Sequence, residues 1–390
     1  MITLTIFSYF LQNNIMGKIL MTWYTCISVF SIVAVKTGLI PSSNVTLFPY
    51  LFLIMTYTIV FSPFFSKSQG FDVERLYFHI NKKYIMFAAI YIVTAAIAIH
   101  YYVPLILQLA QSGTWYENRN ALYLGTFTYS YTWYEYYALI FSGYLRLLAL
   151  IVGFAIIRFG RRTLIGMLTI ITAFVSGILN AMYTSSRGAI INIVLITVVL
   201  YLFFYRNIEK NKRRFITILM LLGCVAIIPY LIDVTVARFS SGGSLDSLIN
   251  YLGHAPVVFN SGVSPITKHM YGEFAFGNLF GDKEFYPSII GGTWGTGFYT
   301  FVGWLFIDWG WIGTIVVAVI VTLILNHIIR KEKYSISNVY IIFFVYYTLL
   351  QGVFVIGRDY CYNIVTSLII YFVVKIIFDK YTFVIGRIRL

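Results

Sequence analysis

Charged residues are scarce in this chain of 390 residues: Asp, Glu, Lys and Arg together make up only 11% of it. Apolar residues make up 59%, more than a soluble domain of this length can bury. Several apolar runs reach the roughly 20 residues that an α-helix needs to cross a bilayer. The sequence therefore predicts an all-α polytopic membrane protein, organised as one integral membrane domain over residues 1–390.

Cysteine is also rare, and the spacing of the three cysteines excludes two kinds of site. Cys26, Cys224 and Cys361 lie far apart in the sequence, so neither a disulfide nor a zinc site is indicated. The chain has no Gly-x-Ser-x-Gly elbow and no pair of histidines at ligand spacing. The acid-x-acid motif Asp72-Val73-Glu74 lies on the side predicted below to be cytoplasmic, and no Asp-x-Asp pair lies on the opposite side. We therefore expect no metal and no cofactor.

Ten apolar stretches are long enough to be predicted as membrane spans. They cover residues 17–37, 45–63, 84–105, 136–157, 163–182, 188–205, 214–232, 311–329, 336–356 and 362–379. With the N-terminus inside, the cytoplasmic segments hold 20 basic and five acidic residues, and the opposite segments hold seven basic and nine acidic ones. This asymmetry places both termini in the cytoplasm. The net charge of +14 therefore reflects basic residues on the cytoplasmic side, where they are attracted to anionic lipid, and it does not indicate nucleic-acid binding.

One long interruption, residues 233–310, separates the seventh and eighth predicted spans. It is rich in glycine and aromatic residues, which favours a folded cap over a disordered loop. Ser244 is expected to cap a short surface helix with Leu245, Leu248 and Leu252 on one face. The apolar run that ends at Asp308-Trp309-Gly310 is too short to cross a bilayer, and we interpret it as a re-entrant or interfacial helix.

Arginines on the predicted outer side are the strongest candidates for chemistry, because the charge bias disfavours cations there. Arg187 lies in the sequence Ser185-Ser186-Arg187-Gly188, Arg238 follows the seventh span, and Arg358 precedes the tenth. A guanidinium offers a planar fork that suits phosphate oxygens, so a cluster of them predicts a lipid diphosphate site. The alternative is interface snorkelling or a structural ion pair. For Arg119, in the smaller outer loop, that alternative is favoured.

Arg146 differs from the other arginines because it lies in the middle of a predicted span. Such a residue is a functional hypothesis by default, but it could instead pair with Glu135 near the outer end of the same helix. The candidate bases on the predicted outer side are His254, His269, Asp308, Asp359, Glu117 and Glu273. His254 and Asp359 are the ones we assign to catalysis, although Asp359 could simply orient Arg358.

Three short motifs in this order resemble those of the bacterial O-antigen polymerase family. They are the Ser185-Ser186-Arg187-Gly188 turn that opens a span, the stretch Tyr251-Leu252-Gly253-His254-Ala255-Pro256-Val257-Val258-Phe259-Asn260, and Gly297-Phe298-Tyr299-Thr300 followed by Asp308-Trp309-Gly310. The resemblance covers about the second half of the chain.

The resemblance implies a GT-C-like membrane glycosyltransferase with one long periplasmic loop that contains short helices. Such an enzyme polymerises oligosaccharide repeat units on undecaprenyl diphosphate at the periplasmic face of the bacterial inner membrane. Its partners would be these lipid-linked oligosaccharides, membrane lipids and a chain-length regulator. Arg187 and Arg358 would act in catalysis, and the diphosphate or glycan would contact Arg238, Arg146, Tyr251, Asn260, Tyr299 and Asp308.

Other functions fit the same architecture. An O-antigen ligase would pass the glycan to a lipid A core instead of a second repeat unit. A flippase for lipid-linked oligosaccharides usually shows repeats and charges spread along its spans, and neither is visible in the sequence. A membrane O-acyltransferase would place His and Arg differently and use a cytoplasmic acyl donor.

Overall fold

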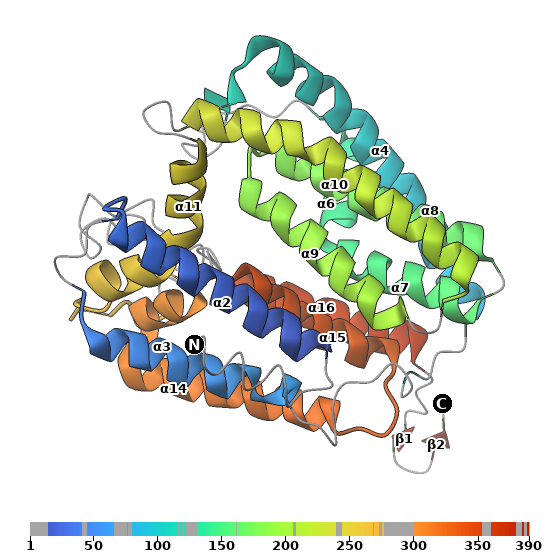
Figure 1. The fold of residues 1–390 in the computed structure, drawn as a ribbon. Helices are drawn as coiled ribbons and strands as arrows, with labels where there is room; N and C mark the ends of the chain where they lie inside the picture. The colour runs from blue at the N-terminus through green and yellow to red at the C-terminus, as the bar shows by residue number, and fades with distance from the viewer. Residues whose placement is uncertain are drawn as a thin grey trace. The chain divides into compact units, whose positions relative to one another are not determined.

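The computed structural model describes most of the predicted spans. It covers residues 15–40, 45–65, 76, 80–115, 117–118, 121, 131–160, 162–205, 208–238, 244–267, 269–272, 275–276, 300–352, 360–379, 384–385 and 388–389. Within these ranges the fold is almost entirely helical, with one small hairpin of β1 (Val384–Ile385) and β2 (Ile388–Arg389) (Figure 1).

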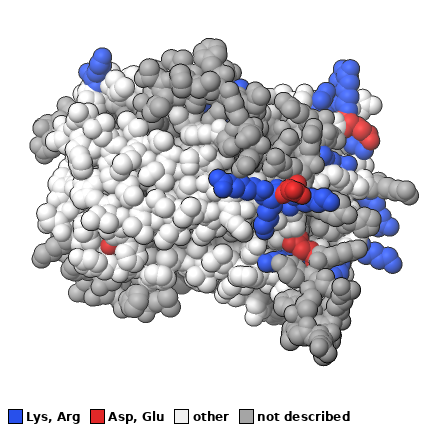
Figure 2. Space-filling model, turned by 90° about the horizontal axis from the view of Figure 1, so that it is seen from below, with Lys and Arg blue, Asp and Glu red and all other residues white. Residues whose placement is uncertain are grey.

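Eight described helices are long and apolar enough to cross a membrane. They are α2 (Ile15–Lys36), α3 with η1 (Leu47–Phe64), α4 (Lys82–Ser112), α8 (Thr163–Tyr183), α9 (Arg187–Phe204), α10 (Lys210–Arg238), α14 (Thr300–Ile329) and α16 (Tyr360–Phe378). Large apolar side chains on these helices are exposed, among them Ile312, which is 82% accessible. Figure 2 shows broad surface areas without any described Lys, Arg, Asp or Glu. Apolar surfaces of this extent are favourable in contact with lipid and unfavourable in contact with water, so the chain is a multi-pass membrane protein.

Two of the ten predicted spans differ from the prediction. The range 136–157 is broken into α6 (Trp133–Tyr144) and α7 (Arg146–Phe159), which bend by 65° at Leu145. The last described helix before α16, α15 (Ile336–Gln351), has only 16 residues and ends before the predicted residue 356. By length and composition, the described part of the chain thus has eight candidate spans, or nine if α6 and α7 form one, instead of ten.

The structure also changes the ends of the predicted cap segment, residues 233–310. Helix α10 continues beyond residue 232 to Arg238, and α14 already begins at Thr300. Between them lie α11 (Ser244–Val258), which starts at the residue expected to cap a helix, and the π-helical turn η4 (Phe259–Val263). Gly310, with φ of 63°, interrupts the helical geometry of α14. The predicted re-entrant or interfacial placement of this segment stays a prediction.

The chain divides into two compact units, and each is described by itself. Unit 1 comprises residues 1–71, 239–331 and 345–366, and unit 2 comprises residues 72–238, 332–344 and 367–390.

In unit 1, helix α3 lies beside α14, and α2 packs along α11 (Figure 1). The α2–α11 contact is close at Gly253, where an added Cβ atom would come within 2.6 Å of the Phe30 carbonyl oxygen. The Ser31 hydroxyl, buried in this contact, donates a hydrogen bond of 2.7 Å to the Gly253 carbonyl. A glycine is therefore needed for the two helix backbones to approach each other.

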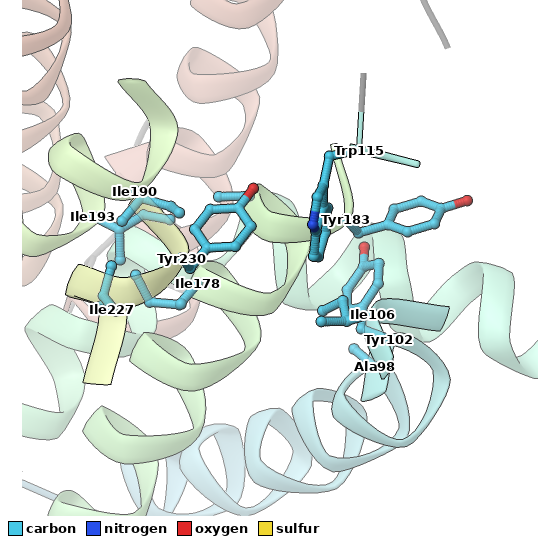
Figure 3. Close-up of a cluster of buried hydrophobic side chains, with 11 residues drawn as sticks. Ala98, Tyr102, Ile106, Trp115, Ile178, Tyr183, Ile190, Ile193, Ile227 and Tyr230 are labelled. Carbon is cyan, nitrogen blue, oxygen red and sulfur yellow. The ribbon is translucent and has the colours of Figure 1, made fainter. Parts of the chain in front are cut away.

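In unit 2, helices α4, α7, α8 and α9 form the core. Helices α7 and α8 approach closely at Gly153 and Gly166, since a Cβ atom on Gly166 would lie 2.7 Å from the Gly153 carbonyl oxygen. A second region of the core joins α4, α8, α9 and α10 around aromatic rings (Figure 3). Its buried side chains are Ala98, Tyr102, Ile106, Trp115, Ile178, Ala181, Tyr183, Ile190, Ile193, Ile227 and Tyr230.

Candidate functional site

The turn between α8 and α9 positions Arg187, the first candidate residue. The main-chain N–H of Ser186 donates to the Ala181 carbonyl, and that of Ser185 donates to the Met182 carbonyl, both at 2.8 Å. This pair of bonds is the Schellman arrangement that ends a helix. Ser185 has φ of +48°, a conformation that usually requires glycine, so the turn holds a strained backbone.

Three further hydrogen bonds fix this turn to its surroundings. The Ser185 hydroxyl donates to the Trp115 carbonyl at 3.2 Å, and the Asn118 amide donates to the Tyr183 carbonyl at 2.7 Å. The Tyr230 hydroxyl donates to the carbonyl of Met182 at 3.2 Å. Trp115, Tyr183 and Tyr230 belong to the buried aromatic core of Figure 3, so these hydrogen bonds connect the turn to packed side chains. The strained conformation is over-determined by these contacts.

Arg187 follows directly as the first residue of α9, and its side chain is only 5% exposed. Ser186 caps the helix, because its hydroxyl accepts a hydrogen bond from the Ala189 N–H. A helix N-terminus and a guanidinium both favour oxygen anions. Burial of this cation at a helix N-terminus capped by Ser186 makes the turn suitable for phosphate binding, whereas the hydroxyls of Thr184 and Ser185 donate to main-chain carbonyls.

In unit 1, Asp308 is the candidate carboxylate that the structure describes most completely. It is fully buried and accepts a hydrogen bond of 2.9 Å from the Tyr360 hydroxyl at the start of α16. The Trp309 indole N–H donates to the same hydroxyl at 3.1 Å. The main-chain N–H of Tyr271 donates to the Asp308 carbonyl at 2.9 Å. The carboxylate is therefore held where three chain segments meet.

His269 was the candidate histidine that the sequence favoured least, yet it lies beside this cluster. Its ring packs edge-on against Phe306, with 5.1 Å between ring centroids. The ring fills the space next to Gly310, where an added Cβ atom would lie 2.8 Å from Nε2. The Nδ1 atom is buried and makes no hydrogen bond. Gly310 lies far from His269 in the sequence, so no local pattern signals this contact.

The stretch from Tyr251 to Asn260 forms α11 and the start of η4. Tyr251 is buried, and His254 is half-buried on the same helix. Burial lowers the pKa of the His254 imidazole below its ordinary value. Both polar atoms of the Asn260 side chain form hydrogen bonds with the main chain of Thr46: Oδ1 accepts from the N–H and Nδ2 donates to the carbonyl. Asn260 therefore has a structural role. A π-helical turn such as η4 is frequent at functional sites.

Arg146 and Arg187 belong to unit 2, whereas Tyr251, His254, Asn260 and Asp308 belong to unit 1. The main chain of Arg238 ends α10, and its side chain lies outside the described part of the protein. Arg358, Asp359 and Tyr299 also lie outside the described residues. The convergence of these arginines under the cap segment stays a prediction.

Within the described ranges, no three His, Cys, Asp or Glu side chains gather as metal ligands would. The expectation of metal-free chemistry stays a prediction. No protein-family model, curated protein or solved structure is significantly similar to this chain.

Proposed function

We propose that the protein is a glycosyltransferase that polymerises undecaprenyl-diphosphate-linked oligosaccharide repeat units on the periplasmic face of a bacterial inner membrane. The observation that carries the proposal is the buried Arg187 at the start of α9, in a strained turn rich in hydroxyl groups. The resemblance of three short motifs to the O-antigen polymerases supplies the reaction class, and the helical membrane architecture agrees with a GT-C-like bundle.

The chemistry requires charge stabilisation more than metal coordination. The hydroxyl of the acceptor sugar attacks the anomeric carbon of the donor glycan, and the bond from that carbon to the diphosphate oxygen breaks. The leaving diphosphate takes the electron pair, and preorganised guanidinium groups such as Arg187 stabilise its developing charge. A carboxylate or imidazole accepts the proton of the attacking hydroxyl.

Three residues compete for the role of base. The sequence assigns Asp359 and His254 to catalysis and gives Asp308 as a further candidate base, whose carboxylate accepts a hydrogen bond of 2.9 Å from the Tyr360 hydroxyl. The lowered pKa of His254 keeps its imidazole neutral near pH 7, which a base needs. Asp308 is fully enclosed, and this favours a role in positioning over direct proton transfer.

The test is chain growth by purified protein supplied with labelled lipid-linked repeat units alone. The wild-type protein should extend the glycan, and Arg187→Ala should abolish long polymer while the protein still folds. Arg187→Lys should also be impaired, because a point charge loses the bidentate geometry. Arg158→Ala, which removes an arginine at the end of α7 that stacks on Phe159, is the matched control. Normal polymer from Arg187→Ala would refute the assigned role.

The same assay separates the polymerase from the ligase. A ligase would transfer the glycan only when a lipid A core is added, and it would not lengthen the lipid-linked glycan without this acceptor. Growth that depends on lipid A core would therefore replace the proposed function with ligation.

A further inference from the structure

Arg146 lies at the break between α6 and α7, inside the apolar part of unit 2. It is the first residue of α7, directly after Leu145, where the chain bends by 65°. Its side chain runs against the backbone of α8 at Gly177: an added Cβ atom there would lie 2.9 Å from Nε and 3.2 Å from Cζ. The absence of a side chain at Gly177 thus makes room for the guanidinium.

The ion pair between Arg146 and Glu135, which the sequence left open as an alternative, is not formed in the structure. The Glu135 carboxylate accepts hydrogen bonds from the Thr132 N–H at 2.8 Å and the Thr132 hydroxyl at 2.7 Å, so it caps its own helix. Arg146 takes no part in the ion pair that joins Lys212 to Glu209. Within the described part of the chain, no carboxylate therefore neutralises Arg146.

The groups around Arg146 are hydroxyls, which do not carry a charge. Tyr91 on α4 interacts with Arg146 and with Ser176, and the Tyr91 hydroxyl donates to the Ser142 carbonyl at 3.0 Å. The Nε atom of Arg146 is buried and makes no hydrogen bond. The site around Arg146 thus combines a positive charge, an Nε–H donor without an acceptor, and uncharged hydroxyl groups from Tyr91 and Ser176.

The Arg146 guanidinium lies beside Gly177, well inside helix α8 and away from its end. Gly177 lies six residues before the end of α8, which corresponds to about 9 Å along the helix axis. A cation at such a depth is costly unless an anion or polar groups compensate it. Arg146 is only half-buried, so part of the residue is accessible to a group from outside the protein.

We propose that Arg146 binds the phosphate of an anionic lipid at the break between α6 and α7. The guanidinium offers its planar donor fork to phosphate oxygens, while the acyl or prenyl chain stays against the apolar helix faces. This site does not rest on the proposed polymerase activity. The phosphate could come from a phospholipid or from a polyprenyl carrier, and the experiment distinguishes them.

The experiment measures lipid binding by native mass spectrometry in dodecyl maltoside micelles, which contain no phosphate. Wild-type protein, Arg146→Met and Arg146→Lys are each titrated with phosphatidylglycerol and with undecaprenyl diphosphate. Arg158→Met, which removes another arginine from α7, is the matched control. The wild-type protein and the control should bind at least one of the two lipids. Arg146→Met should bind it about tenfold more weakly or worse, as expected for loss of a charge-assisted hydrogen bond.

Thermal unfolding in the same micelles distinguishes binding from a structural role. Without added lipid, Arg146→Met should unfold at or above the wild-type temperature, because it removes an uncompensated charge. With lipid, only the wild-type protein and the control should gain stability. If Arg146→Met does not accumulate, Arg146→Lys decides: weaker lipid binding supports the site, and unchanged binding overturns it.

Each binding pattern has a defined meaning. Binding of phosphatidylglycerol alone identifies a phospholipid site, and binding of undecaprenyl diphosphate alone identifies a site for the carrier. Binding of neither lipid, or equal affinity in wild type and Arg146→Met, overturns the proposal. A failed chain-growth assay together with intact lipid binding would refute the polymerase and leave this site in place.

Discussion

Asn260 holds both main-chain polar groups of Thr46. The Thr46 N–H donates to Oδ1 of Asn260 at 2.8 Å, and Nδ2 of Asn260 donates to the Thr46 carbonyl at 2.6 Å. Thr46 is the N-cap residue of α3, and Asn260 belongs to the π-helical turn η4. The bond pair therefore joins segments that lie 214 residues apart in the sequence.

Replacement of Asn260 should destabilise unit 1. Asn260→Ala removes both bonds and leaves the Thr46 main chain unsatisfied, which should cost about 1–3 kcal/mol. Asn260→Asp keeps the acceptor and should cost less. The measurement is thermal unfolding of the purified protein in micelles. Ser261→Ala is the control, because the Ser261 hydroxyl donates a local hydrogen bond to the Val257 carbonyl, four residues earlier in the chain. Equal unfolding temperatures for Asn260→Ala and Ser261→Ala would contradict this role.

Loss of the Tyr360 hydroxyl should also be costly. Tyr360→Phe leaves the enclosed Asp308 carboxylate without its 2.9 Å hydrogen bond, and we expect a loss of about 1–3 kcal/mol. Tyr362→Phe, two residues later in α16, makes the same change in a residue that is 59% exposed and should have a smaller effect. Chemical unfolding monitored by tryptophan fluorescence compares the two variants. A Tyr360→Phe variant as stable as Tyr362→Phe would show that the bond does not stabilise the fold.

The close contact of α2 and α11 predicts that Gly253 tolerates no side chain. Gly253→Val should separate the two helices, because even a Cβ atom would lie 2.6 Å from the Phe30 carbonyl oxygen. We expect poor accumulation of folded protein, measured by fluorescence-detected size-exclusion chromatography. Gly143→Ala is the matched control: no atom lies within 4 Å of its added Cβ, and the change favours the α6 helix by up to about 1 kcal/mol. A normal chromatographic peak for Gly253→Val would argue against the contact.

The lowered pKa of His254 predicts a pH-dependent stability. The unfolded imidazole takes up a proton at a higher pH than the folded one, so the folded state loses relative stability as pH falls below about 6.5. The loss continues until the pH passes the lowered folded pKa. His254→Gln should flatten this part of the profile, measured as unfolding temperature between about pH 7.5 and about pH 5. Parallel profiles for the variant and the wild type would exclude His254 as the cause.

The helices could be predicted from the sequence because lipid requires long apolar segments with internally bonded backbones. The break at Leu145 was not predicted, although the Ser142-Gly143 pair lies just before it, because long apolar segments flank it on both sides. The short length of α15 was missed for a similar reason, since apolar residues continue beyond Gln351.

The candidate site was predictable only in part. The turn before Arg187 is marked in the sequence by its serines, and the rarity of arginine on the predicted outer side singled out Arg187 as a functional candidate, but no pattern predicted its burial. The hydrogen bond between Asp308 and Tyr360 spans 52 residues, and no local pattern encodes such a contact. The same holds for Asn260 and Thr46, whose pairing depends on how α11 packs in unit 1. The sequence left open whether Arg146 pairs with Glu135, and the structure decides against it because the Glu135 carboxylate bonds to Thr132.

The most direct measurement of the proposed reaction is its stoichiometry. Purified protein in micelles receives undecaprenyl-diphosphate-linked repeat units labelled in both the lipid and the sugar, without a lipid A core. Each new glycosidic bond should release one molecule of undecaprenyl diphosphate, and Arg187→Ala should release none. Release of the carrier without a longer glycan, or a longer glycan of equal yield from Arg187→Ala, would contradict the account.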